Sequence, residues 1–249
     1  MKSTKAPTLS PKFDYRLLII VGGYGSGKSE ISVNLARFLA QSESQPVSIA
    51  DLDIVNPYFR SREAADQLAE FGVRSLLPPG DQVHADLPII IPDIRSAIEN
   101  PEGYLILDVG GDDVGARALS SLHDAILPLS YDLLFVLNVR RPFTSDLDGS
   151  LKTMSEIEAS SRLRFTGIIS NTHLMADTTQ EIILAGLTLA REVAKARSLP
   201  ISFVSGERNV VAAMYEQLTT VPVLPLDRAL IKPWEHLGNT WTDKKLRIR

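Results

Sequence analysis

Short apolar runs rich in β-branched residues recur along the chain, and most of them end at glycine or at polar residues. Runs of this kind are typical of strands that are buried on both faces of a sheet. We therefore predict strands over residues 17–21, 48–53, 73–77, 104–109, 133–139, 165–170 and 201–204.

Between these runs, apolar residues return at helical spacing. The spacing predicts helices over residues 29–41, 61–71, 93–99, 147–160 and 178–198. Gly72 follows the second of these and suits the left-handed residue that ends a helix. Strands that alternate with helices predict an α/β fold, a mostly parallel, doubly wound sheet with helices on both faces. Ligands of such sheets bind beyond the carboxyl ends of the strands, so the residues that follow each strand carry the function.

Composition and charge exclude several classes of protein and kinds of site. The chain has 249 residues, 44% of them hydrophobic, and we expect a flexible segment over residues 1–15 and a single domain over residues 16–249. It has no cysteine, which excludes thiolate metal sites and a catalytic thiol. A formal net charge of -4 gives no sign of a nucleic-acid partner. No apolar run approaches the ~20 residues of a membrane span, and the start of the chain lacks a secretory signal, so we expect a cytoplasmic protein without stable membrane insertion.

A glycine-rich segment follows the first predicted strand. Residues 22–29 read GGYGSGKS and fit the pattern G-x-x-x-x-G-K-[ST], with the required strand before it and the required helix after it. Backbone N–H groups in such a loop surround phosphate oxygens, the lysine reaches the β- and γ-phosphates, and the hydroxyl binds Mg²⁺. The nucleotide-binding residues expected here are Gly23, Tyr24, Gly25, Ser26, Gly27, Lys28, Ser29 and Glu30.

Carboxylates stand at the ends of two other strands. Asp51 and Asp53 close the second strand, and Asp108 closes the fourth, just before Gly110 and Gly111. Carboxylates so placed can hold the hydration shell of Mg²⁺ and orient an attacking water. We expect Ser29, Asp53 and Asp108 at the metal, with Lys28, Asp51, Asp53 and Asp108 as the catalytic set; structural caps are the alternative for the aspartates.

The phosphate loop, the sequence Asp51-Leu52-Asp53-Ile54, and Asp108 with its two glycines together resemble the Min- and Par-type ATPases of the SIMIBI class. That class includes the cobyric acid synthase and dethiobiotin synthetase branches. Residues 53–63 and 108–119 also resemble an uncharacterised bacterial ATP-binding family. The resemblance implies that Asp51 orients the hydrolytic water, while Asp53 and Asp108 hold Mg²⁺ through water.

One position departs from that resemblance. The Min- and Par-type proteins carry a lysine early in the loop that crosses a dimer to the partner's nucleotide, and this chain has Gly23 there. The departure leaves a homodimer open. An arginine can supply the missing charge, and the candidates are Arg60, Arg62, Arg140 and Arg141.

The base-recognition residues are expected at two late strand ends. By the same resemblance, Asn171 contacts adenine and Pro225 lies beside the base; a turn-capping role is the alternative for Asn171. Guanine recognition calls for Asn-Lys-x-Asp, whereas Thr172, His173 and Leu174 follow here, so ATP with Mg²⁺ is the expected ligand. The four histidines show no metal-ligand spacing, and only His173 is expected near the site.

Two functions fit these residues. The first is an Mg²⁺-dependent ATPase that works as a nucleotide switch on an unknown protein partner. The alternative is an ATP-dependent kinase or ligase of the dethiobiotin synthetase type, which acts on a small molecule. A degenerate module that binds ATP without turnover is disfavoured, because Lys28, Ser29, Asp53 and Asp108 are all present.

Overall fold

The computed structural model describes residues 9–52, 62–76, 87–111 and 113–228. Its centre is one sheet of eight strands, in the spatial order β3-β2-β4-β1-β5-β6-β7-β8, and every neighbouring pair is parallel. The strands are β1 Leu17–Val21, β2 Val47–Asp51, β3 Val73–Leu76, β4 Tyr104–Val109, β5 Tyr131–Leu137, β6 Gly167–Ser170, β7 Ile201–Glu207 and β8 Val223–Leu226. The predicted parallel α/β sheet is confirmed.

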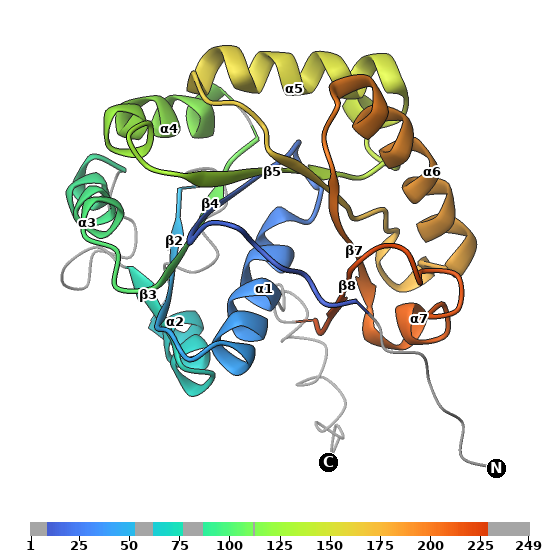
Figure 1. Cartoon of the computed structure of the whole chain (residues 1–249), viewed down its shortest axis with the longest axis horizontal. Coiled ribbons are helices and arrows are strands. Elements are labelled where there is room, and N and C mark those ends of the chain that lie inside the picture. Colours follow the sequence, from blue (N-terminus) through green and yellow to red (C-terminus); the bar gives the residue numbers. More distant parts are fainter. Residues whose placement is uncertain (1–8, 53–61, 77–86, 112, 229–249) are drawn as a thin grey trace, which may run out of the picture.

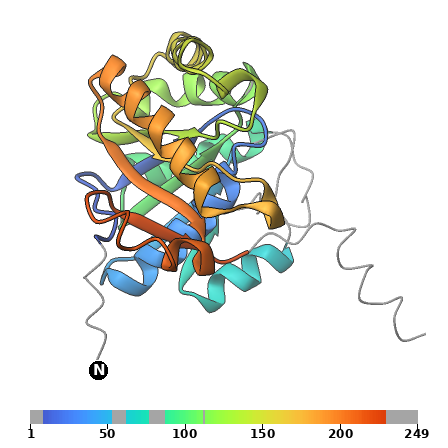
Figure 2. The same ribbon diagram turned by 90° about the vertical axis from the view of Figure 1, so that its right-hand side faces the viewer.

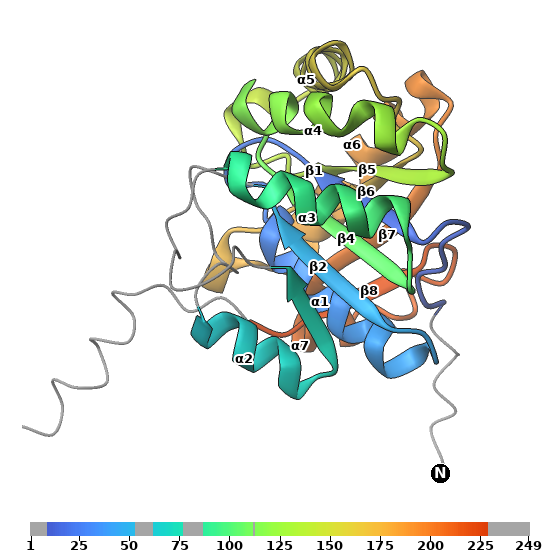
Figure 3. The same ribbon diagram turned by 90° about the vertical axis from the view of Figure 1, so that its left-hand side faces the viewer.

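Helices cover both faces of this sheet (Figure 1). They are α1 Lys28–Ser42, α2 Arg62–Glu70, α3 Leu87–Glu99, α4 Asp113–Ile126, α5 Leu147–Ser161, α6 Gln180–Arg197 and α7 Arg208–Ala212, with short 3-10 turns η1 Pro142–Thr144 and η2 Met175–Asp177. Figure 3 shows α3, α4 and α5 on one side of the sheet and α1 and α2 on the other. In Figure 2, α6 and α7 lie at the β8 side of the molecule.

Alternation along the central strands divides the core between the two faces. In β1, Leu17, Ile19 and Val21 pack toward the α4 and α5 side, and Leu18 and Ile20 pack toward α1. All five are buried, which explains why the run is apolar throughout rather than alternating. A third cluster joins α6 and α7 to β7 and β8.

The sheet extends to both sides of β1. Its neighbours in the sheet are β4 on one side and β5 on the other, and the chain reaches them only after it has built β2 and β3. The carboxyl end of β1 therefore lies at a topological switch point, where open α/β sheets bind their ligands. The glycine-rich segment begins directly there.

Several elements differ from the sequence-based prediction. Strand β8 and helices α4 and α7 were not expected, and α3 begins at Leu87 instead of after Pro92. Proline lacks the N–H that an interior helical residue donates, but its fixed φ suits a helix, so the chain passes through Pro92 with one backbone bond fewer. Gly72 has φ +76 at the end of α2, as predicted.

Part of the expected flexible segment packs on the sheet. The Leu9 carbonyl accepts a hydrogen bond from Val223 N at 2.9 Å, and the Phe13 ring meets Phe203 edge to face with centroids 6.3 Å apart. The described part of this segment therefore contacts β7 and β8, and the flexible segment over residues 1–15 stays a prediction. None of the helices in the described ranges combines the length and apolarity needed to cross a membrane.

Candidate nucleotide site

The glycine-rich segment forms a tight loop that leads into α1. Gly25 and Gly27 have φ values of +71 and +89, a region that other residues rarely enter, and the Ser26 N–H donates to the Gly23 carbonyl at 3.0 Å. The Ile31 N–H donates to the Gly27 carbonyl at 3.0 Å, so the first turn of α1 begins at Lys28. Lys28 and Ser29 are buried, and Glu30 lies in this first turn. A helix N-terminus preceded by such a loop is suited to phosphate.

Side chains from the ends of β5 and β6 support the loop from outside. Asn171 Nδ2 donates to the Ser26 carbonyl at 2.8 Å, and Arg141 Nε donates to the Gly25 carbonyl at 2.6 Å. A Cβ placed on Gly27 would collide with Asn171 Nδ2 and would lie 3.1 Å from His173 Nε2. These contacts hold two carbonyls of the loop on its outer side.

The loop after β4 also reaches the phosphate loop. A Cβ on Gly111 would collide with the carbonyl of Gly22, so the two glycine-containing turns pack backbone against backbone. This contact places the segment that follows Asp108 beside the start of the phosphate loop.

Two of the three predicted site aspartates, Asp51 and Asp108, fall within the described residues, and they lie side by side. Asp51 and Asp108 are register partners on β2 and β4, and their strand positions put both on the α1 face of the sheet. Asp108 is fully buried and Asp51 is 3% exposed. Ser32 of α1 donates its hydroxyl to Asp108 Oδ1 at 3.2 Å. The sheet and the helix that follows the loop thus meet at these carboxylates.

Asn171 has a structural role in this arrangement. Its carbonyl oxygen accepts from the Ser205 hydroxyl at 2.9 Å, its amide holds the Ser26 carbonyl, and the residue is 1% exposed. The side chain therefore ties β6, β7 and the loop together. An adenine contact by Asn171 stays a prediction. Pro225 is half-buried in β8, paired in register with Gly206.

His173 is the one histidine that the described structure brings to the loop, as expected. Burial, followed by the nearby Arg141 charge, lowers the pKa of His173 from 6.5 to about 4. The Met175 N–H donates to His173 Nδ1 at 3.5 Å.

The exposed loop positions differ in their surroundings. Tyr24 is 76% exposed at the loop tip, and a Cβ on Gly23 would meet nothing within 4 Å. Among the arginine candidates, Arg141 contacts the loop and Arg140 is exposed. Asp53 and Arg60 lie outside the described residues, as does the side chain of Arg62.

Buried polar atoms without hydrogen-bond partners gather around this edge of the sheet. They include Ser26 Oγ, Asn138 Nδ2, Ser170 Oγ and His173 Nε2. Buried polar atoms are rarely left unsatisfied, so such a group favours a polar ligand. A triphosphate with Mg²⁺ fits the loop and its acids, since that ion takes only one or two protein ligands beside waters and phosphate oxygens. Within the described ranges there is no group of three or more metal-ligating side chains.

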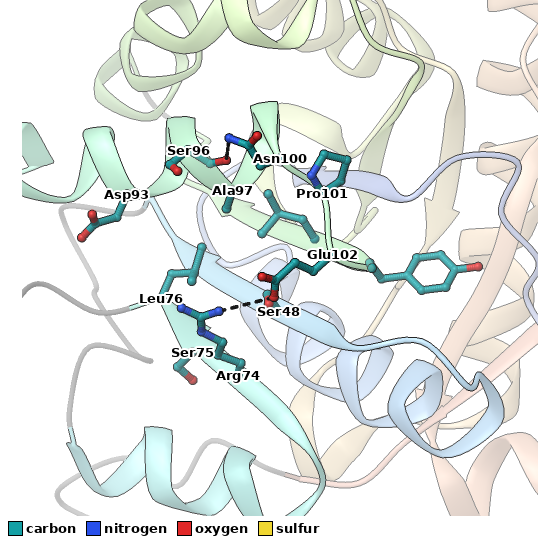
Figure 4. Close-up of a pocket in the computed structure, with 13 residues that line it drawn as sticks. Ser48, Arg74, Ser75, Leu76, Asp93, Ser96, Ala97, Asn100, Pro101 and Glu102 are labelled. Carbon is teal, nitrogen blue, oxygen red and sulfur yellow. Dashed lines mark hydrogen bonds and ion pairs between the residues drawn. The ribbon is translucent and has the colours of Figure 1, made fainter.

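A cavity of about 480 Å³ lies elsewhere in the molecule. Its walls come from β3, the C-terminal half of α3 and the first residues of β2 and β4, so it opens away from the carboxyl ends of the strands. Arg74 and Glu102 form an ion pair of 3.7 Å across it (Figure 4). It is distinct from the loop site.

Some residues of the site carry no motif of their own. Ser32 and Ser205 contact Asp108 and Asn171, respectively, and neither was predicted. Ser32 lies one helical turn beyond Lys28, and its one hydroxyl proton is shared between Asp108 Oδ1 and the Lys28 carbonyl, which lies 2.9 Å from the hydroxyl oxygen. Helical spacing from the motif was the signal that could have found it.

Comparison with known proteins rests on structure. No protein-family model matches this sequence, and no curated protein does. FtsY from Mycoplasma mycoides matches with a TM-score of 0.51 at 19% identity, over 80% of this chain and 63% of that one. The signal recognition particle receptor FtsY from Elizabethkingia anophelis, in complex with GDP, matches with a TM-score of 0.49 at 17% identity, over 82% of this chain and 61% of that one.

A nucleotide-binding protein from Archaeoglobus fulgidus, in complex with ADP, matches with a TM-score of 0.47 at 12% identity, over 81% of this chain and 86% of that one. The chain spans 63% and 61% of the lengths of the two FtsY structures above. At these identities the likeness concerns the fold alone. With the strand order and the loop already described, the chain has the three-layer α/β/α fold of a P-loop NTPase.

Proposed function

We propose that this chain binds ATP with Mg²⁺ at the phosphate loop, hydrolyses it, and acts as a nucleotide-dependent switch. The observation that carries the proposal is the meeting of the loop and the acids: Lys28 and Ser29 are buried at the start of α1, and Ser32 of the same helix donates to Asp108.

Each side chain has a role that its chemistry allows. The Lys28 ammonium neutralises the β- and γ-phosphates, and the Ser29 hydroxyl is the protein ligand of Mg²⁺. Asp108 accepts hydrogen bonds from the metal's waters, as does Asp53, which lies outside the described residues. Asp51, beside Asp108 in register, accepts a proton or a hydrogen bond from the attacking water.

Of the candidate arginines whose side chains the structure describes, Arg140 and Arg141, the second is better placed to supply the charge that the missing loop lysine would carry. Its Nε is held by the Gly25 carbonyl, and a Cβ on Gly25 would lie 3.1 Å from its Cζ. The guanidinium thus lies against the loop of its own chain, where an arginine in cis can stabilise charge on the transferred phosphate. This role requires no second copy of the chain.

The choice of ATP rests on the residues around Asn171. Thr172 is buried behind it and its hydroxyl accepts from Val139 N, while Leu174 stands where a guanine-binding aspartate would be expected. A small-molecule kinase or ligase is the second candidate, because the lysine that crosses the dimer in a standard Min- or Par-type switch is replaced here by Gly23.

Phosphate release from Mg-ATP tests the proposal. We expect slow hydrolysis by the wild type that requires Mg²⁺ and falls about a hundredfold or more in Asp51→Ala and Asp108→Asn, as for the loss of a general base or a metal-side carboxylate. Asp148→Ala, an exposed acid in the first turn of α5, is the control and should keep wild-type turnover. Full turnover in Asp51→Ala would remove the water-orienting role.

A competition measurement tests the base. GTP at the same concentration as ATP should displace little of the bound ATP, and equal displacement would overturn the assignment of adenine.

A measurement of turnover separates the two candidate functions. Stimulation of turnover by a small molecule carrying a carboxylate, with no effect of any protein partner, would favour the kinase or ligase.

A further inference from the structure

His173 lies beside the phosphate loop. It follows β6 by three residues, the residue is half-buried, and its buried Nε2 would be 3.1 Å from a Cβ on Gly27. Gly27 is the residue directly before Lys28, so the imidazole packs on the part of the loop that begins the helix. The established features of the phosphate loop do not use this ring.

The neighbours of the ring determine which nitrogen carries the proton. Met175 N donates to Nδ1, which therefore presents its lone pair. Burial, and after it the nearby positive charge of Arg141, lowers the pKa of the ring and disfavours a second proton on it. The imidazole is therefore neutral at pH 7, with its one proton on Nε2.

That proton has no acceptor in the described structure. Nε2 is buried and makes no hydrogen bond. The loop carbonyls of Ser26 and Gly25 accept from Asn171 and Arg141, respectively, and neither accepts from Nε2. A buried donor without an acceptor is costly, and the two side chains that hold the loop beside it do so with donor atoms, Asn171 Nδ2 and Arg141 Nε. The missing partner is therefore an oxygen acceptor, and an anionic one suits this setting best.

We propose that His173 donates its Nε2–H to an oxygen of the sugar–phosphate part of the bound nucleotide, beside Gly27. The residue acts in its neutral form, as a binding residue that the phosphate-loop motif does not contain. This inference rests on the proposed nucleotide binding and adds a contact to that same site.

Two substitutions separate the hydrogen bond from the packing. In His173→Asn, the amide oxygen can replace Nδ1 as the acceptor for Met175 N, but no donor reaches the position of Nε2. In His173→Gln, the longer side chain can place its amide NH₂ near that position. Calorimetric titration with Mg-ATP should show about tenfold weaker binding by His173→Asn, the effect of one lost hydrogen bond to a charged group, and affinity within about threefold of the wild type for His173→Gln.

Titration of the same proteins with tripolyphosphate identifies the acceptor. Weaker binding of both ligands by His173→Asn assigns a phosphate oxygen, and weaker binding of Mg-ATP alone assigns a sugar oxygen. Unchanged Mg-ATP affinity of His173→Asn would overturn the proposal. Equal losses in the two variants would also overturn it, because the ring would then serve packing alone.

If either variant does not fold, NMR of the wild-type protein still tests the proposed hydrogen bond. In protein labelled with ¹⁵N-histidine, only four residues contribute signals. Mg-ATP should slow solvent exchange of the His173 Nε2 proton and shift its ¹⁵N resonance; an unchanged resonance at saturating Mg-ATP would refute the contact. A wild type that binds no Mg-ATP would instead reject the proposed function itself.

Discussion

Glycine is required at some positions of the phosphate loop and not at others. Gly27 has φ +89, and any Cβ there would collide with Asn171 Nδ2. Gly23, four residues earlier, has open space around it and no positive φ. The two glycines of one loop therefore have different physical reasons for being there.

We expect Gly27→Ala to lower the free energy of unfolding by about 2–4 kcal/mol, from left-handed backbone strain and the displaced Asn171. Gly23→Ala should change it by less than about 1 kcal/mol. Urea denaturation of both variants measures the difference. Similar stabilities would mean that the loop relaxes around an added Cβ.

The pKa of His173 makes stability depend on pH. The unfolded chain takes up this proton near pH 6.5, while the folded chain does so only near pH 4. The unfolded state therefore binds more protons between these values, and stability falls as the pH drops through this window.

At 1.36 kcal/mol per pH unit, lowering the pH from 7 to 5 should cost about 2 kcal/mol through this group. In His173→Asn that contribution should vanish, so the loss of stability over the same pH interval should be about 2 kcal/mol smaller than in the wild type. Denaturant unfolding at the two pH values measures it, and equal losses in the two proteins would show that His173 is not held neutral.

At the scale of elements, a buried acid connects the outer helices. Glu158 of α5 accepts from Arg197 of α6 at 2.6 Å, from Arg164 at 3.1 Å and from Phe165 N at 3.1 Å, and its side chain is 5% exposed. Burial raises its pKa, but the Arg197 and Phe165 hydrogen bonds lower it more, so the pKa of Glu158 lies below its ordinary value. Its contribution to stability is therefore present at neutral pH and is lost in acid.

Removing this acid should be costly. We expect Glu158→Ala to lower the free energy of unfolding by about 3 kcal/mol, because Arg197 and the Phe165 N–H lose their acceptor. Glu156→Ala provides the matched control on the same helix. Its side chain is 64% exposed and pairs with Lys152 at 4.0 Å, so its loss should cost less than about 1 kcal/mol. Equal effects in the two variants would count against the buried network.

The strands also show which elements can be predicted from the sequence pattern and which cannot. The strand over residues 104–109 was predicted to the residue, because its apolar positions, interrupted only by Asp108, form a short run bounded by Gly103 and Gly110. Strand β8 was missed: its four residues, VLPL, contain a proline that usually argues against a strand. Pro225 is tolerated because β8 is the last strand of the sheet, with a neighbour on one side only. Position in a sheet is a tertiary property that local pattern does not contain.

The candidate site likewise has parts that the sequence predicts and parts that depend on tertiary structure. The motif predicted the loop and its lysine, and strand ends predicted Asp51 and Asp108, because parallel strands bring their carboxyl ends to one edge. Arg141 and His173 were named as candidates, but the particular groups that they contact, the Gly25 carbonyl and Gly27, depend on how the turns after β5 and β6 fold back and could not be predicted. The predicted metal role of Asp53 lies outside the described residues and stays a prediction.

At the scale of the whole molecule, the fold gathers the predicted site residues at the carboxyl ends of the central strands. Strand order places β1 between β4 and β5, so helix α1, which follows the phosphate loop, contacts Asp108 from β4, and the loop itself contacts Arg141, which follows β5. In a P-loop fold this edge is where a triphosphate binds. The account as a whole therefore depends on Lys28 and the loop that presents it.

Equilibrium binding of Mg-ATP, measured by calorimetry on the wild type, Lys28→Ala and Lys152→Ala, tests this directly. Lys152 is an exposed lysine of α5, remote in sequence from the loop. The account predicts saturable binding of one Mg-ATP by the wild type and by Lys152→Ala, and a loss of about a hundredfold or more in Lys28→Ala, as expected when charge-assisted bonds to phosphate are removed. Undiminished affinity in a folded Lys28→Ala protein would contradict it.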